Sequence, residues 1–356
     1  MPRKENKPAL KIGGRTVGGN APAFIIAELS ANHGQKLETA LKSVRAAAKA
    51  GADAIKLQTY TADTLTIDSD KKYFRINQGT LWDGRTLYDL YKEAYTPWDW
   101  HYKLKKAAVD EGLVFFSTPF DRTAADFLEE LGVPAYKIAS FELTDLPLVE
   151  YVAAKGKPVI ISAGISTLPE IAGAVAACRK VKNGRVALLK CTSSYPAPYG
   201  EMNLLTMPDL GARFGCVAGL SDHSEGITAP VAAAALGAKI IEKHFILDRK
   251  LGGPDAAFSL EAGGFAAMVK AVRQAEASLG KVTYKLSVAS RRSRKFSRSL
   301  FAVADIRKGE AFTEVNVRSI RPADGLPPKH LPEILGRRAA DDIERGTPLK
   351  WAHLKK

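Results

Sequence analysis

The sequence lacks long hydrophobic runs and has few residues suited to disulfide chemistry. Among its 356 residues, no uninterrupted apolar segment reaches the ~18 residues that a membrane-spanning helix needs. The N-terminal segment has no apolar signal core, so we expect an intracellular, cytoplasmic protein. The three cysteines, Cys178, Cys191 and Cys216, cannot all pair with one another and lack the spacing of a zinc ribbon. We interpret them as reduced thiols.

Two nucleotide-binding motifs are also missing. There is no GxxxxGK[ST] P-loop, and no GxGxxG opens a helix after a strand, so a nucleotide site is not indicated. The composition, with 46% hydrophobic and 25% charged residues, is typical of a globular protein and excludes collagen-like and disordered classes.

The net charge of +14 is concentrated at the C-terminal end. Residues 281–356 contain 18 Lys and Arg against 8 Asp and Glu, a net charge of +10, which leaves +4 for the first 280 residues. The densest run, RRSRKFSR at 291–298, lacks the interleaved aromatic pattern of a single-strand binder, and no helix-turn-helix or RNP-type motif follows it. We interpret it as a solvated linker or a positive surface that attracts an anionic substrate; nucleic-acid binding is the alternative.

Eight short apolar or β-branched runs recur along the chain, each followed by a segment of helical periodicity. Glycine stands at or just beyond the end of several helical segments, as at Gly51 and Gly237, where it suits a helix C-cap. Eight strands alternating with helices predict a (β/α)8 barrel, and a doubly wound open sheet is the alternative with a similar pattern. The eight runs are 24–29, 54–59, 113–119, 135–140, 158–164, 186–193, 216–222 and 239–245.

Three parts are predicted from these patterns. Residues 1–280 form the catalytic barrel, 281–297 a basic linker, and 298–356 a small β-rich domain. The long gap between the second and third runs is an insertion that we expect at the mouth of the active site. Near its end, Thr96 and Pro97 predict the start of a helix.

The C-terminal ends of the eight runs carry an unusual set of polar side chains. In a barrel these ends converge on one face, where active sites form. Buried strands seldom carry Lys unless it is paired or functional, because an isolated charge is costly to desolvate. Lys56 and Lys137 both stand within apolar runs, so we expect them to bind a phosphorylated or carboxylated substrate, although solvent-facing positions would also explain either lysine alone.

Two histidines end neighbouring runs. His223 and His244 follow the seventh and eighth strands, where their imidazoles can meet and bind a divalent metal, with other coordination positions left open. Two histidines with local hydrogen bonds are the alternative. The turn ISAGIS at 161–166 could bind phosphate through its backbone N–H groups, and we interpret Cys191 as structural.

Many ordered motifs together resemble the sialic acid synthase family, which condenses phosphoenolpyruvate with an amino-sugar aldehyde. The resemblance covers nearly the whole chain, and its C-terminal part is similar to the family's antifreeze-like (SAF) domain. The matching segments are IIAELSANH (25–33), KLQTY (56–60), STPFD (117–121), KIASFEL (137–143), CTSSYPAP (191–198), GLSDHS (219–224), EKHF (242–245), GGPDAAFSLE (252–261) and IRPADG (320–325).

The resemblance implies a (β/α)8 barrel followed by a SAF domain, assembled as a domain-swapped homodimer that binds neither nucleic acid nor membrane. It implies that His223 and His244 bind a divalent ion, Mn2+ with Mg2+ or Co2+ as alternatives. Tyr195 and Asp255 match sugar-binding positions, and Arg321 matches an arginine delivered by the partner subunit. Catalytic positions are matched by Glu28, Gln58 and Glu142, and positions that hold phosphoenolpyruvate by Lys56, Thr118, Lys137, Ser140, Ser162, Ser193 and Ser221.

Within the family, the segments at 79–98, 191–198 and 252–261 resemble the pseudaminic acid branch. That branch uses 2,4-diacetamido-2,4,6-trideoxy-altrose, whose 6-methyl group Trp82 and Tyr88 could contact; packing in the core is the alternative for both residues. The alternatives are an N-acetylneuraminate or legionaminic acid synthase, an aldolase with a lysine Schiff base, and a non-enzymatic protein that binds glycan or nucleic acid.

Overall fold

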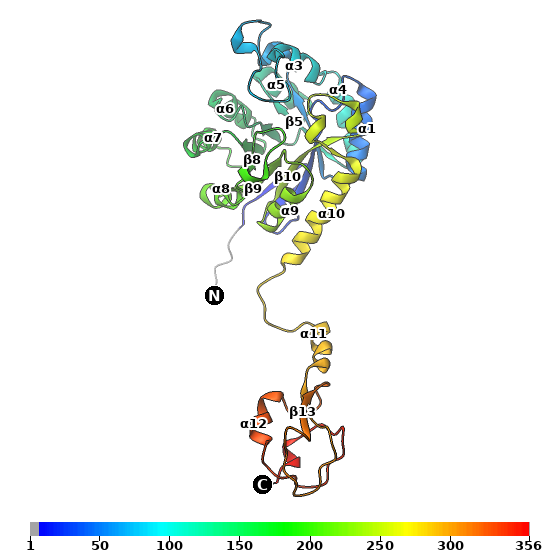
Figure 1. Cartoon of the computed structure of the whole chain (residues 1–356). Coiled ribbons are helices and arrows are strands. Elements are labelled where there is room, and N and C mark those ends of the chain that lie inside the picture. Colours follow the sequence, from blue (N-terminus) through cyan, green and yellow to red (C-terminus); the bar gives the residue numbers. More distant parts are fainter. Residues whose placement is uncertain (1–6, 356) are drawn as a thin grey trace. The chain divides into compact units, whose positions relative to one another are not determined.

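The computed structural model describes residues 7–355, which divide into two compact units at Gly280 and Lys281. The N-terminal unit is built around a closed barrel of eight parallel strands (Figure 1). β10 hydrogen-bonds to both β9 and β3, so the barrel has no open edge. The strands are β3 (Phe24–Glu28), β4 (Ala54–Thr59), β5 (Val114–Pro119), β6 (Tyr136–Ile138), β7 (Val159–Ala163), β8 (Val186–Cys191), β9 (Val217–Asp222) and β10 (Ile240–Ile246).

Each predicted apolar run matches one of these strands to within two residues at either end, so the predicted barrel is confirmed and the open sheet is wrong. Helices surround the barrel and bury one face each. In the first of them, Ala40, Ser43, Val44 and Ala47 are buried at helical spacing. The helices are α1 (Leu37–Lys49), α4 (Trp100–Asp110), α5 (Arg122–Glu130), α6 (Leu146–Ala154), α7 (Leu168–Lys180), α8 (Thr206–Phe214), α9 (Thr228–Ala235) and α10 (Ala262–Leu279).

A hairpin of β1 (Ala9–Ile12) and β2 (Arg15–Gly18) lies against the N-terminal ends of the barrel strands. Leu10, Ile12 and Val17 are buried in the same hydrophobic cluster as the barrel. The backbone at Gly18 approaches Val217 at the start of β9 so closely that any side chain there would collide. The hairpin therefore covers the bottom of the barrel, opposite the face on which the strands end.

The insertion after β4 contains α2 (Ala62–Leu65), the 3-10 turn η1 (Lys72–Phe74) and α3 (Leu87–Ala94). The predicted helix start at Thr96 is wrong, because α4 begins at Trp100. The hydroxyl of Thr96 is buried and lies 3.2 Å from Nε2 of His33. This hydrogen bond uses the side chain that an N-cap would require.

The C-terminal unit begins with an exposed segment that contains α11 (Val288–Ser293) and η5 (Arg294–Phe296). β12 (Ser299–Ala302) and β13 (Val317–Ile320) then pair antiparallel, and α12 (Leu331–Ile334) follows. The short turns are η2 (Tyr199–Glu201), η3 (Arg249–Leu251), η4 (Ala256–Phe258), η6 (Pro328–His330) and η7 (Trp351–His353), and β11 (Leu260–Glu261) adds to β10. Within residues 7–355, no helix has the length and apolar character to cross a membrane.

Candidate active site

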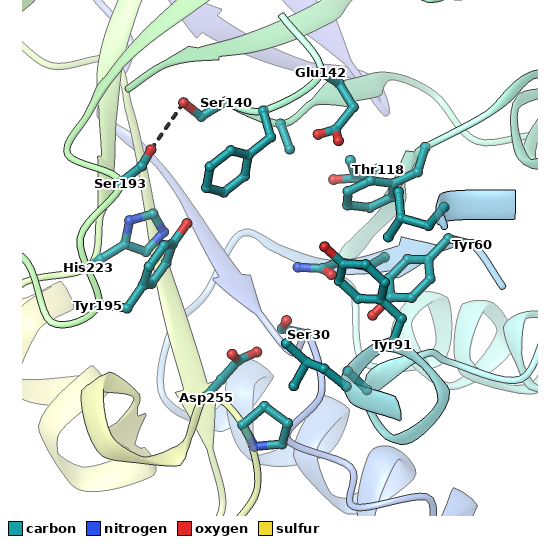
Figure 2. Close-up of a pocket in the computed structure, with 18 of the residues that line it drawn as sticks. Ser30, Tyr60, Tyr91, Thr118, Ser140, Glu142, Ser193, Tyr195, His223 and Asp255 are labelled. Atoms are coloured by element: carbon teal, nitrogen blue, oxygen red, sulfur yellow. Dashed lines mark hydrogen bonds between the residues drawn. The ribbon is translucent and has the colours of Figure 1, made fainter. Parts of the chain in front are cut away.

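A cavity of about 440 Å³ opens at the C-terminal ends of the barrel strands. The residues that the resemblance matched to catalytic, substrate-binding and metal-binding positions within the barrel all line this cavity, and Figure 2 labels several of them. These residues are Glu28, Lys56, Gln58, Thr118, Lys137, Ser140, Glu142, Ser162, Ser193, Tyr195, Ser221, His223, His244 and Asp255.

Two buried lysines flank a buried carboxylate on the cavity floor. Nζ of Lys56 lies 3.9 Å, and Nζ of Lys137 3.8 Å, from the same oxygen, Oε1 of Glu242. Burial opposes the charged form of Glu242, but Lys137 and Lys56 together lower its pKa. Both lysines also donate to hydroxyls, Lys56 to Thr118 at 3.1 Å and Lys137 to Ser162 at 2.7 Å. The floor therefore holds two cations with directed N–H donors, which suit phosphate or carboxylate oxygens.

A second carboxylate, Glu28 at the end of β3, completes this group. Its Oε2 lies 2.7 Å from Nζ of Lys56, and its Oε1 accepts a hydrogen bond from Nε2 of Gln58 at 3.1 Å. Burial raises the pKa of Glu28, and the attraction of Lys56 offsets this only in part. A carboxylate with a raised pKa takes up a proton more readily than an ordinary one, which suits a general acid or base.

Hydroxyls and backbone N–H groups form a compact donor set beside the lysines. Oγ of Ser140 accepts hydrogen bonds from the backbone of Gly164 at 2.9 Å and Ile165 at 3.1 Å. Ser193 donates to the same oxygen at 3.0 Å, the bond drawn in Figure 2. A Cβ atom at position 164 would overlap both serine hydroxyls, so this turn requires glycine. The loose ISAGIS turn of the sequence is thus ordered by Ser140.

The two predicted metal ligands face each other across the top of the barrel. The ring centroids of His223 and His244 are 5.3 Å apart. Nδ1 of His244 is buried without a hydrogen-bond partner, and its nearest acid is Oδ2 of Asp255 at 3.8 Å. Burial, with the charge of His223 adding to it, keeps the pKa of His244 well below the usual value, so the ring is neutral, as a ligand must be.

This pair fits a metal with two protein ligands. The described part of the chain has no group of three or more His, Cys, Asp or Glu side chains arranged to hold a cation. Two imidazoles with an unpartnered ring nitrogen match a site whose remaining positions belong to water or substrate. Cys191 also lines the cavity, with Sγ 3.7 Å from Nδ1 of His223.

Aromatic side chains enclose the histidine pair. Tyr195 packs against His223 with ring centroids 4.4 Å apart, and Trp82 from the insertion packs against Tyr195 at 5.6 Å. The indole N–H of Trp82 donates to the carbonyl of Pro254 at 3.0 Å. The insertion is thereby tied to the loop that carries Asp255, and both contribute to one cavity.

Glu142 lies on the loop after β6, facing the cavity from the side of Thr118 (Figure 2). Its Oε2 is buried without a hydrogen-bond partner. Burial raises the pKa of this carboxyl to about 7, and Lys137 opposes the shift only in part. Glu142 can therefore exchange a proton near neutral pH.

Some polar residues near the strand ends lie away from the cavity. His33 is buried against Trp100, and burial lowers its pKa to about 4. Lys243 is fully buried and paired with Asp222, 2.6 Å away.

Two residues predicted to contact the sugar are not part of the cavity lining. Tyr88 does not line the cavity and donates to Asp63, so the expected contact of Tyr88 with a sugar is not supported. Arg321 is an exposed residue of the C-terminal unit.

Two kinds of cavity residue escaped assignment from the sequence. Glu242 stands in the matching segment EKHF (242–245) but was given no role, although it lies between both lysines. Apart from Trp82 and Tyr88, apolar residues of the insertion were not singled out, because an apolar helical stripe predicts burial without saying what it faces. The lining residues without a predicted role include Ser30, Tyr60, Leu65, Ile76, Leu87, Leu90, Tyr91 and Glu242.

Residues 43–284 match the sequence model of the NeuB family, and residues 297–355 match that of the SAF domain. The chain is 50% identical over 327 residues to pseudaminic acid synthase of Campylobacter jejuni, covering 92% of this chain and 95% of that protein. It is 47% identical to pseudaminic acid synthase of Helicobacter pylori over 329 residues, 92% of this chain and 96% of the relative. A solved N-acetylneuraminic acid (sialic acid) synthetase from Leptospira borgpetersenii, in complex with citrate, is 34% identical. It superposes with a TM-score of 0.72 over 81% of this chain and 95% of that one.

Proposed function

The chain belongs to the NeuB family, and from that membership we propose that it is a pseudaminic acid synthase. The reaction joins phosphoenolpyruvate, 2,4-diacetamido-2,4,6-trideoxy-altrose and water, and yields the nonulosonic acid and inorganic phosphate. The observation that carries the proposal is one cavity containing both the lysine pair on Glu242 and the histidine pair. Relatives that are synthases disfavour a non-enzymatic binding protein or a Schiff-base aldolase.

The choice of branch rests on identity. The chain is 50% identical to a pseudaminic acid synthase but 34% identical to a sialic acid synthetase. We retain an N-acetylneuraminate or legionaminic acid synthase as the alternative, because sister enzymes would share the lysine and histidine pairs.

We assign phosphoenolpyruvate to the floor of the cavity. Lys56 and Lys137 would neutralise its carboxylate and phosphate, which otherwise repel an approaching nucleophile. Thr118 accepts a hydrogen bond from Lys56, and Ser162 accepts one from Lys137, so these hydroxyls fix the two ammonium groups. Ser221 donates to Oε1 of Glu242 at 3.1 Å. The backbone N–H groups of Gly164 and Ile165 and the hydroxyl of Ser193 already donate to Oγ of Ser140. The hydroxyl hydrogen of Ser140 remains to donate to a phosphate oxygen.

Two bonds form and one breaks in the proposed reaction. C3 of phosphoenolpyruvate bonds to the aldehyde carbon, whose oxygen takes up a proton. A water oxygen then bonds to C2 and gives its proton to a carboxylate, for which we propose Glu28 because of its position and raised pKa. The bond between C2 and the bridging oxygen breaks last. Its electron pair leaves with phosphate, and the new C2 hydroxyl gives its proton to the departing phosphate and becomes the keto oxygen of the product. Gln58 keeps Glu28 oriented, and Glu142 is a second proton carrier.

We propose that His223 and His244 hold a divalent cation, Mn2+ with Mg2+ or Co2+ as alternatives. A bound cation would polarise the sugar aldehyde as a Lewis acid. Tyr195 stacks beside His223 and Asp255 lies beside His244, so both are placed to contact the sugar near its reacting end.

We further propose a domain-swapped homodimer in which Arg321 of each subunit reaches the sugar in the partner's barrel. The domain boundaries of this proposal are a barrel to residue 280, a linker over 281–297 and a SAF domain to residue 356. A C-terminal unit with net charge +10 suits contact with anionic substrates. We place the reaction in the cytoplasm, where phosphoenolpyruvate is available.

The direct test is phosphate release from phosphoenolpyruvate with purified enzyme and each candidate sugar in turn. We expect release with the 2,4-diacetamido-2,4,6-trideoxy-altrose and little release with N-acetylmannosamine. Oxygen-18 in the bridging C–O position should leave with phosphate, because the C–O bond breaks. Release only with another branch's sugar would assign the chain to that branch, and no release with any sugar would refute the proposal.

A further inference from the structure

One helix of the insertion turns its apolar stripe toward the cavity. α3 carries Leu87, Leu90, Tyr91 and Ala94 at positions i, i+3, i+4 and i+7, which share one helix face. All four line the cavity. Among the described residues, none of these four belongs to the hydrophobic core of the barrel. Leu90 is buried, whereas Leu87, Tyr91 and Ala94 keep part of their surface exposed, so part of the stripe is available to a molecule in the cavity.

Further apolar residues extend this surface. Leu65 at the end of α2 and Ile76 also line the cavity. Tyr60 packs edge-on against Tyr91, with ring centroids 5.8 Å apart. We call Tyr60, Leu65, Ile76, Leu87, Leu90 and Tyr91 the apolar wall. Figure 2 shows Tyr60 and Tyr91 on the opposite side of the pocket from His223 and Tyr195.

The segment that carries the wall is held in place by its own hydrogen bonds. Asp83 accepts bonds from the backbone of Gln78, Gly79 and Thr80, and these bonds lower its pKa to about 2. Thr86 caps α3 by accepting from the backbone N–H of Asp89. Together with the hydrogen bond from Trp82 to Pro254, these contacts hold the segment that carries the apolar wall in place without any bound substrate.

We infer that the apolar wall is the subsite for the terminal carbon of the acceptor sugar, and that it selects a methyl group over a hydroxymethyl group. The inference rests on the proposed function, and it follows from how the cavity is divided. The aldehyde must lie near the histidine pair and the enol near the lysines. The distal end of a six-carbon chain then points to the opposite side, where the wall lies.

Chemistry at the wall favours a deoxy terminus. A methyl group loses unfavourable contact with water there, whereas a hydroxyl loses its hydrogen bonds to water. The insertion also brings Arg75 to the cavity, but its guanidinium is already bound to Oδ1 of Asp70 at 2.9 Å. In an apolar pocket, one added hydroxyl group on the substrate typically changes kcat/KM by roughly 10–100-fold.

The test compares two acceptor sugars that differ only in carrying CH3 or CH2OH at the terminal carbon. With phosphoenolpyruvate saturating, we expect the native enzyme to show a kcat/KM ratio of about 10–100 in favour of the methyl sugar. Equal values, or a preference for the hydroxymethyl sugar, would overturn the inference while leaving a synthase in place. Phosphate release with neither sugar would refute the proposed function and the inference with it.

Variants locate the selectivity. Leu87→Ser should lower the ratio at least about fivefold by weakening use of the methyl sugar, with an unchanged KM for phosphoenolpyruvate. Leu65→Ser, on a different helix, provides the same measurement if the first variant does not fold. Tyr88→Phe is the matched control, because Tyr88 is the next residue of α3 but does not line the cavity. If the ratio of the two kcat/KM values stays at the native value in both serine variants, the apolar wall does not determine the selectivity, and the inference is overturned.

Discussion

Lys243 donates to Oδ2 of Asp222 at 2.6 Å, and both side chains are fully buried. The same ammonium donates to the carbonyl of Ser224, while Oδ1 of Asp222 accepts from the backbone N–H of Ser224 at 2.9 Å. These contacts fix the residues on both sides of His223. The ion pair thus positions one of the two proposed metal ligands without lining the cavity itself.

Lys243→Met should therefore destabilise the protein and weaken metal binding. Removing one partner leaves Asp222 as an unpaired buried charge, which costs about 3–5 kcal/mol in the free energy of unfolding. Denaturant unfolding and calorimetric Mn2+ titration measure the two effects. The double variant with Asp222→Asn should recover much of the stability. Lys180→Met, which breaks the exposed pair with Glu150, is the control and should cost less than about 1 kcal/mol. Equal losses in both lysine variants would contradict the assigned role.

Removal of divalent metal should abolish phosphate release, and added Mn2+ should restore it. Substituting a residue that hydrogen-bonds to a metal ligand typically weakens metal binding by ~10–100-fold. His223→Ala removes a ligand itself, so it should weaken Mn2+ binding by more than this. Calorimetric titration of metal into the protein measures this without turnover. His330→Ala is the control, because His330 lies in the C-terminal unit beside Glu333. Full activity in metal-free enzyme would refute the role of both cavity histidines.

Glu142→Gln should change how stability depends on pH. Because the folded pKa of about 7 exceeds the ordinary value of 4.5, the folded protein binds an extra proton between these two values. Stability contributed by this group therefore falls as the pH rises from about 4.5 to 7. The glutamine variant lacks this loss, so at pH 8 it should be more stable than the native protein by on the order of 3 kcal/mol, since each pKa unit corresponds to about 1.4 kcal/mol. Denaturant unfolding at pH 4.5 and pH 8 measures the difference, which should vanish at the lower pH. A constant difference across this range would contradict the raised pKa.

Gly164→Ala should impair the binding of phosphoenolpyruvate. The added methyl group overlaps the hydroxyls of Ser140 and Ser193, and such overpacking costs about 1–3 kcal/mol. Steady-state kinetics should show a KM for phosphoenolpyruvate raised by roughly 10–100-fold. Gly184→Ala, where an added Cβ meets no atom within 4 Å, should leave KM unchanged. An unaltered KM in the first variant would place the phosphate elsewhere.

Mixing two inactive variants tests the proposed exchange of C-terminal units. Arg321→Ala removes the arginine, and Lys56→Ala disables the barrel. In mixed dimers one intact barrel would receive an intact Arg321, so activity should return to about a quarter of the native value. Phosphate release after co-refolding measures it. If each barrel used its own Arg321, the mixture would stay as inactive as the separate variants.

Much of the fold was predictable because each barrel strand is a continuous apolar run. The strand ends also predicted the cavity, since parallel strands bring their C-terminal residues to one face. Which residues of a strand face the cavity depends on the alternation of side chains along it. In β10, Glu242 and His244 point into the cavity and Lys243 points away, and this could be known only from the register of the strand.

Other features depended on tertiary contacts. Thr96 has the residue type of an N-cap, but its hydroxyl binds His33, and the helix begins later. The stripe on α3 predicts an apolar face, yet the sequence does not say that this face borders a cavity. The placement of the insertion comes from the contact between Trp82 and Pro254, which are 172 residues apart in sequence.

Within residues 7–355, the hairpin of β1 and β2 covers the end of the barrel opposite the cavity. On the proposed assignment, phosphoenolpyruvate occupies the deeper floor and the sugar the outer part of the same passage. The two reactants must then enter in sequence, the enol ester before the sugar. After the reaction, the bulky nine-carbon acid lies between the phosphate and the opening and has to depart first. The order in which substrates bind and products leave then follows from the closure of the barrel by the hairpin.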